Sequence, residues 1–139
     1  MIKLPSKMRA PVMRRLKNEY FAWLSTVGTD LTPQPRPIWF IWDHDEFLIY
    51  SPPKAHKIQH LMRHPRVAVH FNADATGDND VLVFIGTARI DRDAPLAHKV
   101  PAYLKKYRDG IAGLKMTPDE MAAEYSTAIR VSVTSVRGW

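Results

Sequence analysis

The segment from residue 51 to residue 65, SPPKAHKIQHLMRHP, concentrates positive charge where a helix is expected to begin. It holds Lys54, Lys57 and Arg63 together with three histidines, and it contains no aspartate or glutamate. The first turn of a helix offers free backbone N–H groups and the positive end of the helix dipole. With Lys54, His56 and Lys57 in that turn, the segment predicts a site for a phosphate or a similar anion.

Two plainer interpretations of this segment remain open from its residues. The first is a solvated basic face on an amphipathic helix, with Ile58, Leu61 and Met62 in the core. The second is a metal site, since the three histidines recur every four residues and neutral imidazole is a good zinc ligand. The segment lacks carboxylates and thiolates, and its lysines would repel a cation, so we expect no metal.

The composition favours an anionic partner but does not identify one. The chain of 139 residues carries a net charge of +6 and has no cysteine, and its sequence pI is about 9.7. Such charge suits nucleic acid, a membrane surface or a phosphorylated small molecule. Arg36, Trp39 and Trp42 interleave basic and aromatic residues, but no RNP-like, zinc-finger or helix-turn-helix pattern is present. We therefore expect neither nucleic acid nor a membrane as partner.

The length and a hydrophobic content of 45% predict one globular domain over residues 1–139. No apolar run approaches the roughly 20 residues of a membrane span. The N-terminal residues are basic but lack the apolar core of a signal peptide. We expect a cytoplasmic protein.

The elements that must position the basic segment are mostly strands. An N-terminal helix is expected within residues 1–19, and a helical insertion is expected over residues 92–125, with helices at 95–108 and 117–125. Strands are expected at residues 20–28, 34–42, 47–51, 66–71, 81–91 and 126–139. A hairpin turn is expected at residues 43–46, and a β-bulge at Gly86. Six short strands joined mainly by hairpins predict a mainly β fold, a small antiparallel barrel with flanking helices, since closure removes exposed edges.

The order of these elements resembles a known family. A strand containing PQPRPIWF precedes a hairpin, then S-x-x-x-x-x-K-x-x-x-L-x-x-H-P, then the strand RVAVHF, and the chain ends with VRGW. This arrangement is similar to the pyridoxamine-phosphate-oxidase-like split β-barrel superfamily, and in particular to its flavin- and deazaflavin-dependent oxidoreductases. The resemblance covers residues 20 to 139 and implies a six-stranded antiparallel split barrel of the FMN-binding type.

The resemblance also implies a cofactor, either FMN or the deazaflavin coenzyme F-420. Lys57 falls on the family's phosphate-binding lysine, with Ser51, Lys54 and His56 as further phosphate contacts. His56 stands where the pyridoxamine phosphate oxidases have arginine, which argues against their vitamin substrate. Pro37, Ile38 and Trp39 are expected against the flavin ring, with Arg36 near the phosphate or the ring edge.

The resemblance also implies a homodimer with the cofactor at the interface, as in other members of this family. The resemblance implies that Arg137 and Trp139 complete the site of a partner copy, while packing on their own barrel is the alternative. Residues 92–117 are expected to cap the barrel or to shape the substrate entrance. Their basic residues, including Lys105, Lys106 and Arg108, are expected to form a solvated helix face in preference to a second binding site.

The expected activity is hydride transfer between the cofactor and an unsaturated small molecule of unknown identity. Tyr50, His70 and water are the candidate proton donors, with His70 more simply explained as a core or barrel-lining residue. The alternative is a non-catalytic protein on the same barrel: a flavin or haem carrier, or a nucleic-acid-binding module.

Overall fold

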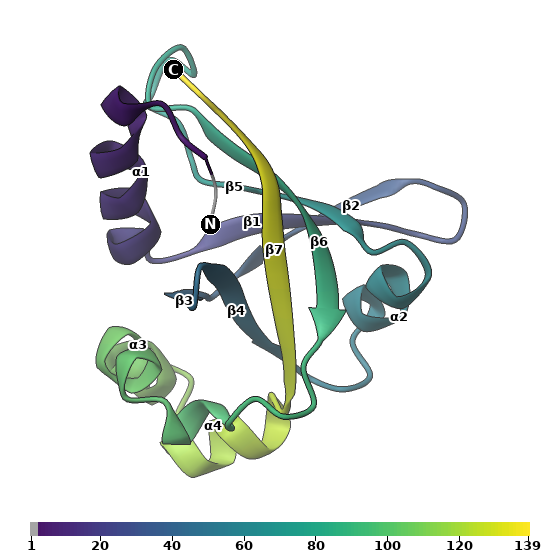
Figure 1. Cartoon of the computed structure of the whole chain (residues 1–139). Coiled ribbons are helices and arrows are strands. Elements are labelled where there is room, and N and C mark those ends of the chain that lie inside the picture. Colours follow the sequence, from purple (N-terminus) through teal and green to yellow (C-terminus); the bar gives the residue numbers. More distant parts are fainter. Residues whose placement is uncertain (1–2) are drawn as a thin grey trace.

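A computed structural model describes residues 3–139 and shows a curled antiparallel sheet flanked by helices (Figure 1). The sheet order is β2-β1-β5-β6-β7-β4-β3. The strands are β1 (Ala22–Val27), β2 (Pro33–Ile38), β3 (Ile41–Asp43), β4 (Glu46–Ser51), β5 (Arg66–His70), β6 (Leu82–Ile90) and β7 (Thr127–Gly138). The helices are α1 (Ser6–Asn18), α2 (His56–Arg63), the short 3₁₀ helix η1 (Ala97–Lys99), α3 (Pro101–Gly113) and α4 (Pro118–Glu124). The predicted mainly β split barrel is confirmed.

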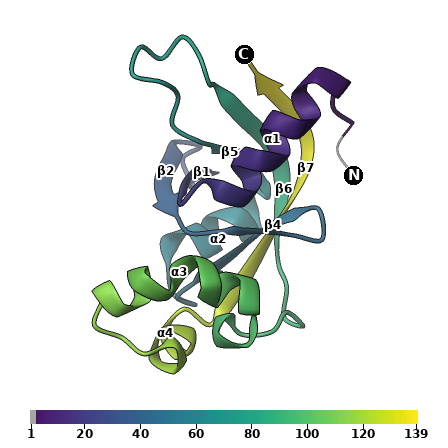
Figure 2. The same ribbon diagram turned by 90° about the vertical axis from the view of Figure 1, so that its left-hand side faces the viewer.

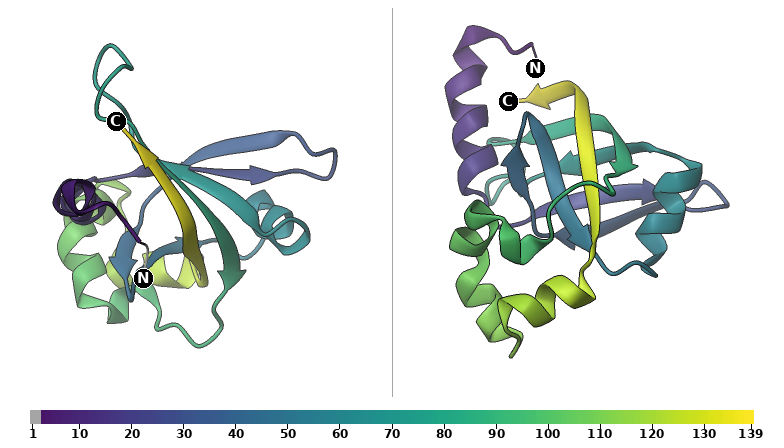
Figure 3. Two further views of the ribbon diagram at one scale, coloured as in Figure 1. Left: turned by 45° about the horizontal axis from the view of Figure 1, so that its top comes forward. Right: turned by 60° about the horizontal axis from the view of Figure 1, so that its bottom comes forward.

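The sheet has seven strands where six were predicted, because the strand predicted at 34–42 is two strands. β2 pairs with β1 at one edge of the sheet, and β3 pairs with β4 at the other edge. Between them, Phe40 leaves the ladder: its N–H donates to the Tyr107 hydroxyl at 2.8 Å. That hydroxyl lies 2.8 Å from the Phe40 carbonyl and 2.6 Å from the Tyr20 carbonyl, the two acceptors for its single proton. The continuous segment 33–43 therefore joins the two edges of the sheet, which is curled into a half-barrel (Figure 3).

Local sequence signals set the turns of the sheet. The hairpin between β3 and β4 turns at His44 and Asp45, whose φ angles of 52° and 60° fit a type I′ turn. The register of β6 against β7 shifts between Ile85 and Gly86, so the predicted bulge is confirmed. A Cβ at Gly86 would lie 2.5 Å from the backbone oxygen of Ser132, which explains the glycine.

Two apolar cores pack on opposite sides of β4. Phe47 and Ile49 face the inside of the curl, where α1 and α2 add buried side chains. Leu48 and Tyr50 face a second core that α3 and α4 cover. Figure 2 shows α3 and α4 together at one end of the molecule, below α1. Because side chains alternate along a strand, burying both faces of β4 ties the helical insertion firmly to the barrel.

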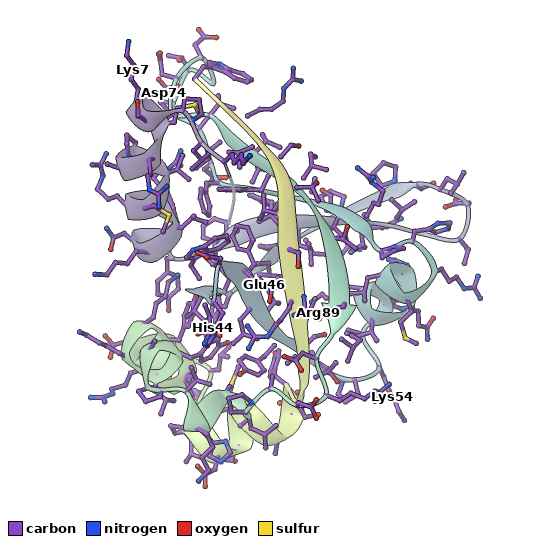
Figure 4. The ribbon with its side chains drawn as sticks, in the orientation of Figure 1. Lys7, His44, Glu46, Lys54, Asp74 and Arg89 are labelled. Carbon is purple, nitrogen blue, oxygen red and sulfur yellow. The ribbon has the colours of Figure 1, made fainter. Side chains whose placement is uncertain are left out.

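Ion pairs join β3, β4, β6 and β7 next to the second core. The guanidinium of Arg130, only 8% exposed, donates to Asp91 at 2.7 Å and to Asp43 at 3.0 Å. Arg89 donates to Glu46 at 2.9 Å, and Figure 4 shows the two side chains meeting beside β7. The hydrogen bond from Arg89 lowers the pKa of Glu46 to about 2. These pairs fix the hairpin of β3 and β4, and β4 contributes Tyr50 to the lining of the candidate site.

No helix among residues 3–139 is both long and apolar enough to cross a membrane.

Candidate functional site

A cavity of about 230 Å³ lies between the sheet and the helical insertion. The end of β2 and the residue after it form one wall, and α2 contributes a single cation. The opposite wall comes from α3, α4 and the residues around them. The lining residues are Pro37, Ile38, Trp39, Tyr50, Lys57, Tyr103, Leu114, Met121 and Tyr125.

Lys57 is the charged group of this cavity, and it has no partner of opposite charge. The side chain is half-buried, and no ion pair or hydrogen bond joins it to another residue in the described part of the chain. Burial, and then the positive charge of nearby Arg36, lower the pKa of Lys57. Two cations held this close without a carboxylate form a site that favours an anion.

The start of α2 adds backbone donors to this cation. The helix begins at His56, after Ala55, and no side chain caps it. Its first N–H groups therefore point out of the helix beside Lys57, which lies in the first turn. The prediction that Lys54 belongs to the first turn is wrong, because the proline-rich approach to the helix delays its start.

Aromatic rings make the apolar part of the cavity. Trp39 stacks on Tyr107, with ring centroids 4.6 Å apart and planes within 7°. Tyr107 packs in turn on Tyr103, whose ring edge meets Tyr50. Such a continuous aromatic packing holds the wall rigid and gives it a flat surface suited to a planar ring.

The candidate proton donors occupy different places. Tyr50 lines the cavity, but its hydroxyl donates to the carbonyl of Pro95 at 2.6 Å, and burial raises its pKa to about 12. His70 lies outside the barrel: its ring stacks on Trp23, with centroids 6.4 Å apart, and it faces away from the buried Val69. The barrel-lining interpretation of His70 is therefore wrong, because the alternation along β5 turns it outward.

Other predicted cofactor contacts lie beside the cavity or far from it. Ser51 is fully buried and donates to the carbonyl of Pro52. Lys54 is exposed and projects outward before α2 (Figure 4). His56 is exposed at the first position of α2. Arg36 is exposed on β2 and donates to the carbonyl of Pro35, although it is close enough to Lys57 to influence its charge.

The C-terminal pair lies at the other end of the molecule. Arg137 is opposite Val83 near the end of β7, and Trp139 is 69% exposed and lines a groove with residues of α1. Figure 1 shows this end of β7 far from α4. Within one chain, the fold thus brings Pro37, Ile38, Trp39 and Lys57 together and leaves Arg137 and Trp139 apart.

Four lining residues on the insertion had not been singled out as cofactor contacts. They are Tyr103, Leu114, Met121 and Tyr125. Apolar residues at helical spacing look the same whether they face a core or a cavity, so periodicity could not find them. Tyr103 and Leu114 belong to the region 92–117, which had been expected to cap the barrel or shape the substrate entrance; in the structure this region packs on the second core beside β4.

Comparisons with known proteins agree with this architecture. The family model described as "Pyridoxamine 5'-phosphate oxidase" matches residues 8–139. The chain belongs to this family. Among curated proteins, none matches it.

Solved structures repeat the fold at low sequence identity. A conserved hypothetical protein of Mycobacterium tuberculosis, Rv2991, is 20% identical with a TM-score of 0.76, over 99% of this chain and 86% of that one. A structure described as an F420 reductase is 24% identical with a TM-score of 0.66, over 89% and 94%. HutZ, a heme storage protein of Vibrio cholerae, is 14% identical with a TM-score of 0.61, over 92% of each chain. At these identities the likeness concerns the fold.

Residues 3–139 contain no group of three or more His, Cys, Asp or Glu side chains placed to hold a metal ion.

Proposed function

We propose that this protein is an oxidoreductase that binds FMN or coenzyme F-420 at the Lys57 cavity and reduces an unsaturated small molecule. The observation that carries the proposal is the half-buried Lys57 side chain, with Arg36 close by and no acidic partner among the described residues. The family membership and the fold shared with an F420 reductase support the same class of cofactor.

The residues of the cavity suit a flavin-type group. Lys57 and the free N–H groups of α2 would hold its phosphate, and Pro37, Ile38 and Trp39 would line its ring system. The cofactor supplies the hydride chemistry. The chain's own residues orient the ring, exclude water through the aromatic wall and hold the phosphate by charge.

A second copy of the chain completes the site. The cavity of about 230 Å³ is smaller than the roughly 300–1,000 Å³ of most small-molecule sites, so one chain holds only part of the cofactor. The outer face of β1, β5 and β6 carries Trp23, Ala68, Val83 and Ile85, half-buried apolar side chains outside both cores. Such a face suits an apolar interface between copies, next to the prolines of β2.

Tyr125 is the cavity's candidate proton donor. It lines the wall contributed by the insertion, and no hydrogen bond engages its hydroxyl within the described chain. The hydroxyl of Tyr50, by contrast, is already committed to Pro95. Tyr125 is therefore placed to donate a hydrogen bond or a proton to a bound substrate, with water as the alternative source.

A carrier of haem or flavin is the second candidate, because the fold is shared with a heme storage protein. Parallel fluorescence and absorbance titrations with FMN, coenzyme F-420 and haem separate the two candidates. Binding of FMN or F-420, followed by substrate-dependent oxidation of the reduced coenzyme, supports the oxidoreductase. Binding of haem alone, or of a flavin without turnover across a panel of enones and quinones, supports the carrier.

A further inference from the structure

A second cavity of about 710 Å³ lies between α1 and α3, where β3 reaches the edge of the sheet. Leu16, Ile41 and Trp42 supply apolar walls, and Lys17, Lys105 and Lys106 supply positive charge. We name it the α1–α3 groove. Figure 1 shows β3 ending in the space between these two helices.

The groove is separate from the Lys57 cavity, because α3 divides the two. Tyr103 of α3 lines the Lys57 cavity, whereas Ala102, Lys105 and Lys106 line the groove. The two cavities share no lining residue. A ligand in the groove therefore does not contact the phosphate site.

Lys106 is the unusual group of the groove. The sequence predicted a solvated helix face, but Lys106 is half-buried, with its ammonium 3.8 Å from the ring centroid of Phe40 and donating to the Phe40 carbonyl at 2.9 Å. Burial lowers its pKa to about 8. The nearest acidic group to influence it is Glu19, whose carboxylate is paired with Arg15 at 2.7 Å. Lys106 thus lacks an ion pair in the described chain.

Trp42 gives a second, independent sign of a missing polar partner. Its indole N–H is buried and has no hydrogen-bond acceptor among residues 3–139. A buried donor without an acceptor costs about 1–3 kcal/mol, and the Trp42 side chain contributes to the groove as part of its apolar wall. Lys17 and Lys105, both exposed and without ion pairs in the part of the chain that is described, add charge at the rim.

We infer that the α1–α3 groove binds an amphipathic carboxylate, such as a medium-chain fatty acid. The carboxylate lies at Lys106 with Lys17 and Lys105 at the rim, and the acyl chain lies along the exposed Met13 and along Trp42. The groove combines an apolar surface with several lysines that lack ion pairs. It therefore fits an apolar anion better than a neutral lipid or a phosphate.

Titration of the whole protein with decanoate, by calorimetry, tests this inference, with decanol as the neutral analogue. We expect micromolar binding of decanoate and at least about tenfold weaker binding of decanol or of decanoate to Lys106→Met, the loss of one charge-assisted hydrogen bond. Lys99→Met, at an exposed lysine of η1, serves as the matched control and should leave the affinity within about twofold. Added FMN should not compete.

Equal binding of decanol and decanoate, no effect of Lys106→Met, or no binding of decanoate would overturn the inference. The wild-type protein provides a readout that does not depend on the folding of a variant. In a protein with 15N-labelled lysines, decanoate should shift the Nζ resonance of Lys106 and raise its titration midpoint above about 8. An unchanged Lys106 resonance at saturating decanoate would place the ligand elsewhere.

Discussion

Replacing Lys57 by methionine separates a phosphate-binding lysine from a structural one. Methionine keeps the apolar stem in its half-buried place and removes only the charge. Because burial and Arg36 already disfavour the charge of Lys57 in the free protein, Lys57→Met should leave the free energy of unfolding unchanged or raise it. The affinity for the cofactor, by contrast, should fall.

The expected loss of affinity follows from the contact that disappears. A hydrogen bond to a charged group contributes about 1.5–3 kcal/mol when it is well placed, which corresponds to about 10- to 150-fold in Kd. Lys57→Met should therefore weaken FMN or F-420 by this factor. The assay is a fluorescence titration at physiological ionic strength, together with urea denaturation of the cofactor-free protein.

Lys99→Met is the control, since it removes the same charge from an exposed position outside the cavity. Its cofactor affinity should change by less than about twofold. If Lys57→Met binds the cofactor as tightly as the wild type, the phosphate assignment is refuted. If it also unfolds more easily than the wild type, Lys57 is a structural residue that stabilises the folded chain.

Three further perturbations test other parts of the structure. The free energy of unfolding should rise as pH increases from about 8 to 10.5, because over this range the unfolded chain keeps the Lys106 proton that the folded chain has lost. Lys106→Met should flatten this rise when unfolding by urea is followed at each pH. Stability contributed by Glu46 is present above about pH 4.5 and lost towards pH 2; Glu46→Gln should cost about 1 kcal/mol at pH 7 and little at pH 2, by chemical denaturation. Gly110→Ala should destabilise by about 1–3 kcal/mol, because its Cβ would meet the Tyr20 hydroxyl and the Trp39 ring at under 3 Å. Gly113→Ala in the same helix has nothing within 4 Å and should stabilise by up to about 1 kcal/mol in thermal unfolding.

Each of the three has an outcome that contradicts its reasoning. An unchanged pH profile in Lys106→Met would mean that Lys106 titrates as an exposed lysine. A loss in Glu46→Gln that persists at pH 2 would point to packing instead of the pair with Arg89. Equal effects of Gly110→Ala and Gly113→Ala would mean that the helix, not the contact with Trp39, sets the cost.

Local signals predicted most of the elements. Gly86 marked the bulge, and the hairpin turn at residues 43–46 was predicted from its polar residues. The helix predicted at 117–125 is α4, which starts with a capping box formed by Thr117 and Glu120. These features depend on residues close together in the chain, so the sequence alone could specify them.

The candidate site was predicted in part. The motif around Lys57 and the strand PRPIW led to the side chains that now line one cavity. Ser51 was expected to face the phosphate, yet it is fully buried at the end of β4. A hydroxyl that satisfies a neighbouring carbonyl and one that binds a ligand have the same sequence signature.

The sequence by itself determined the fold class, the family and the concentration of positive charge before and within α2, since periodicity, turn residues and motif order are local properties. Tertiary structure alone decided where the continuous run 34–42 crosses from one sheet edge to the other, because Tyr107, distant in the chain, takes the backbone groups of Phe40. It also decided which lysines are half-buried without a counter-charge: Lys57 and Lys106 are, whereas Lys54 is exposed. Burial and the absence of a partner are properties of the surroundings of a side chain, and those surroundings come from segments that only folding brings together.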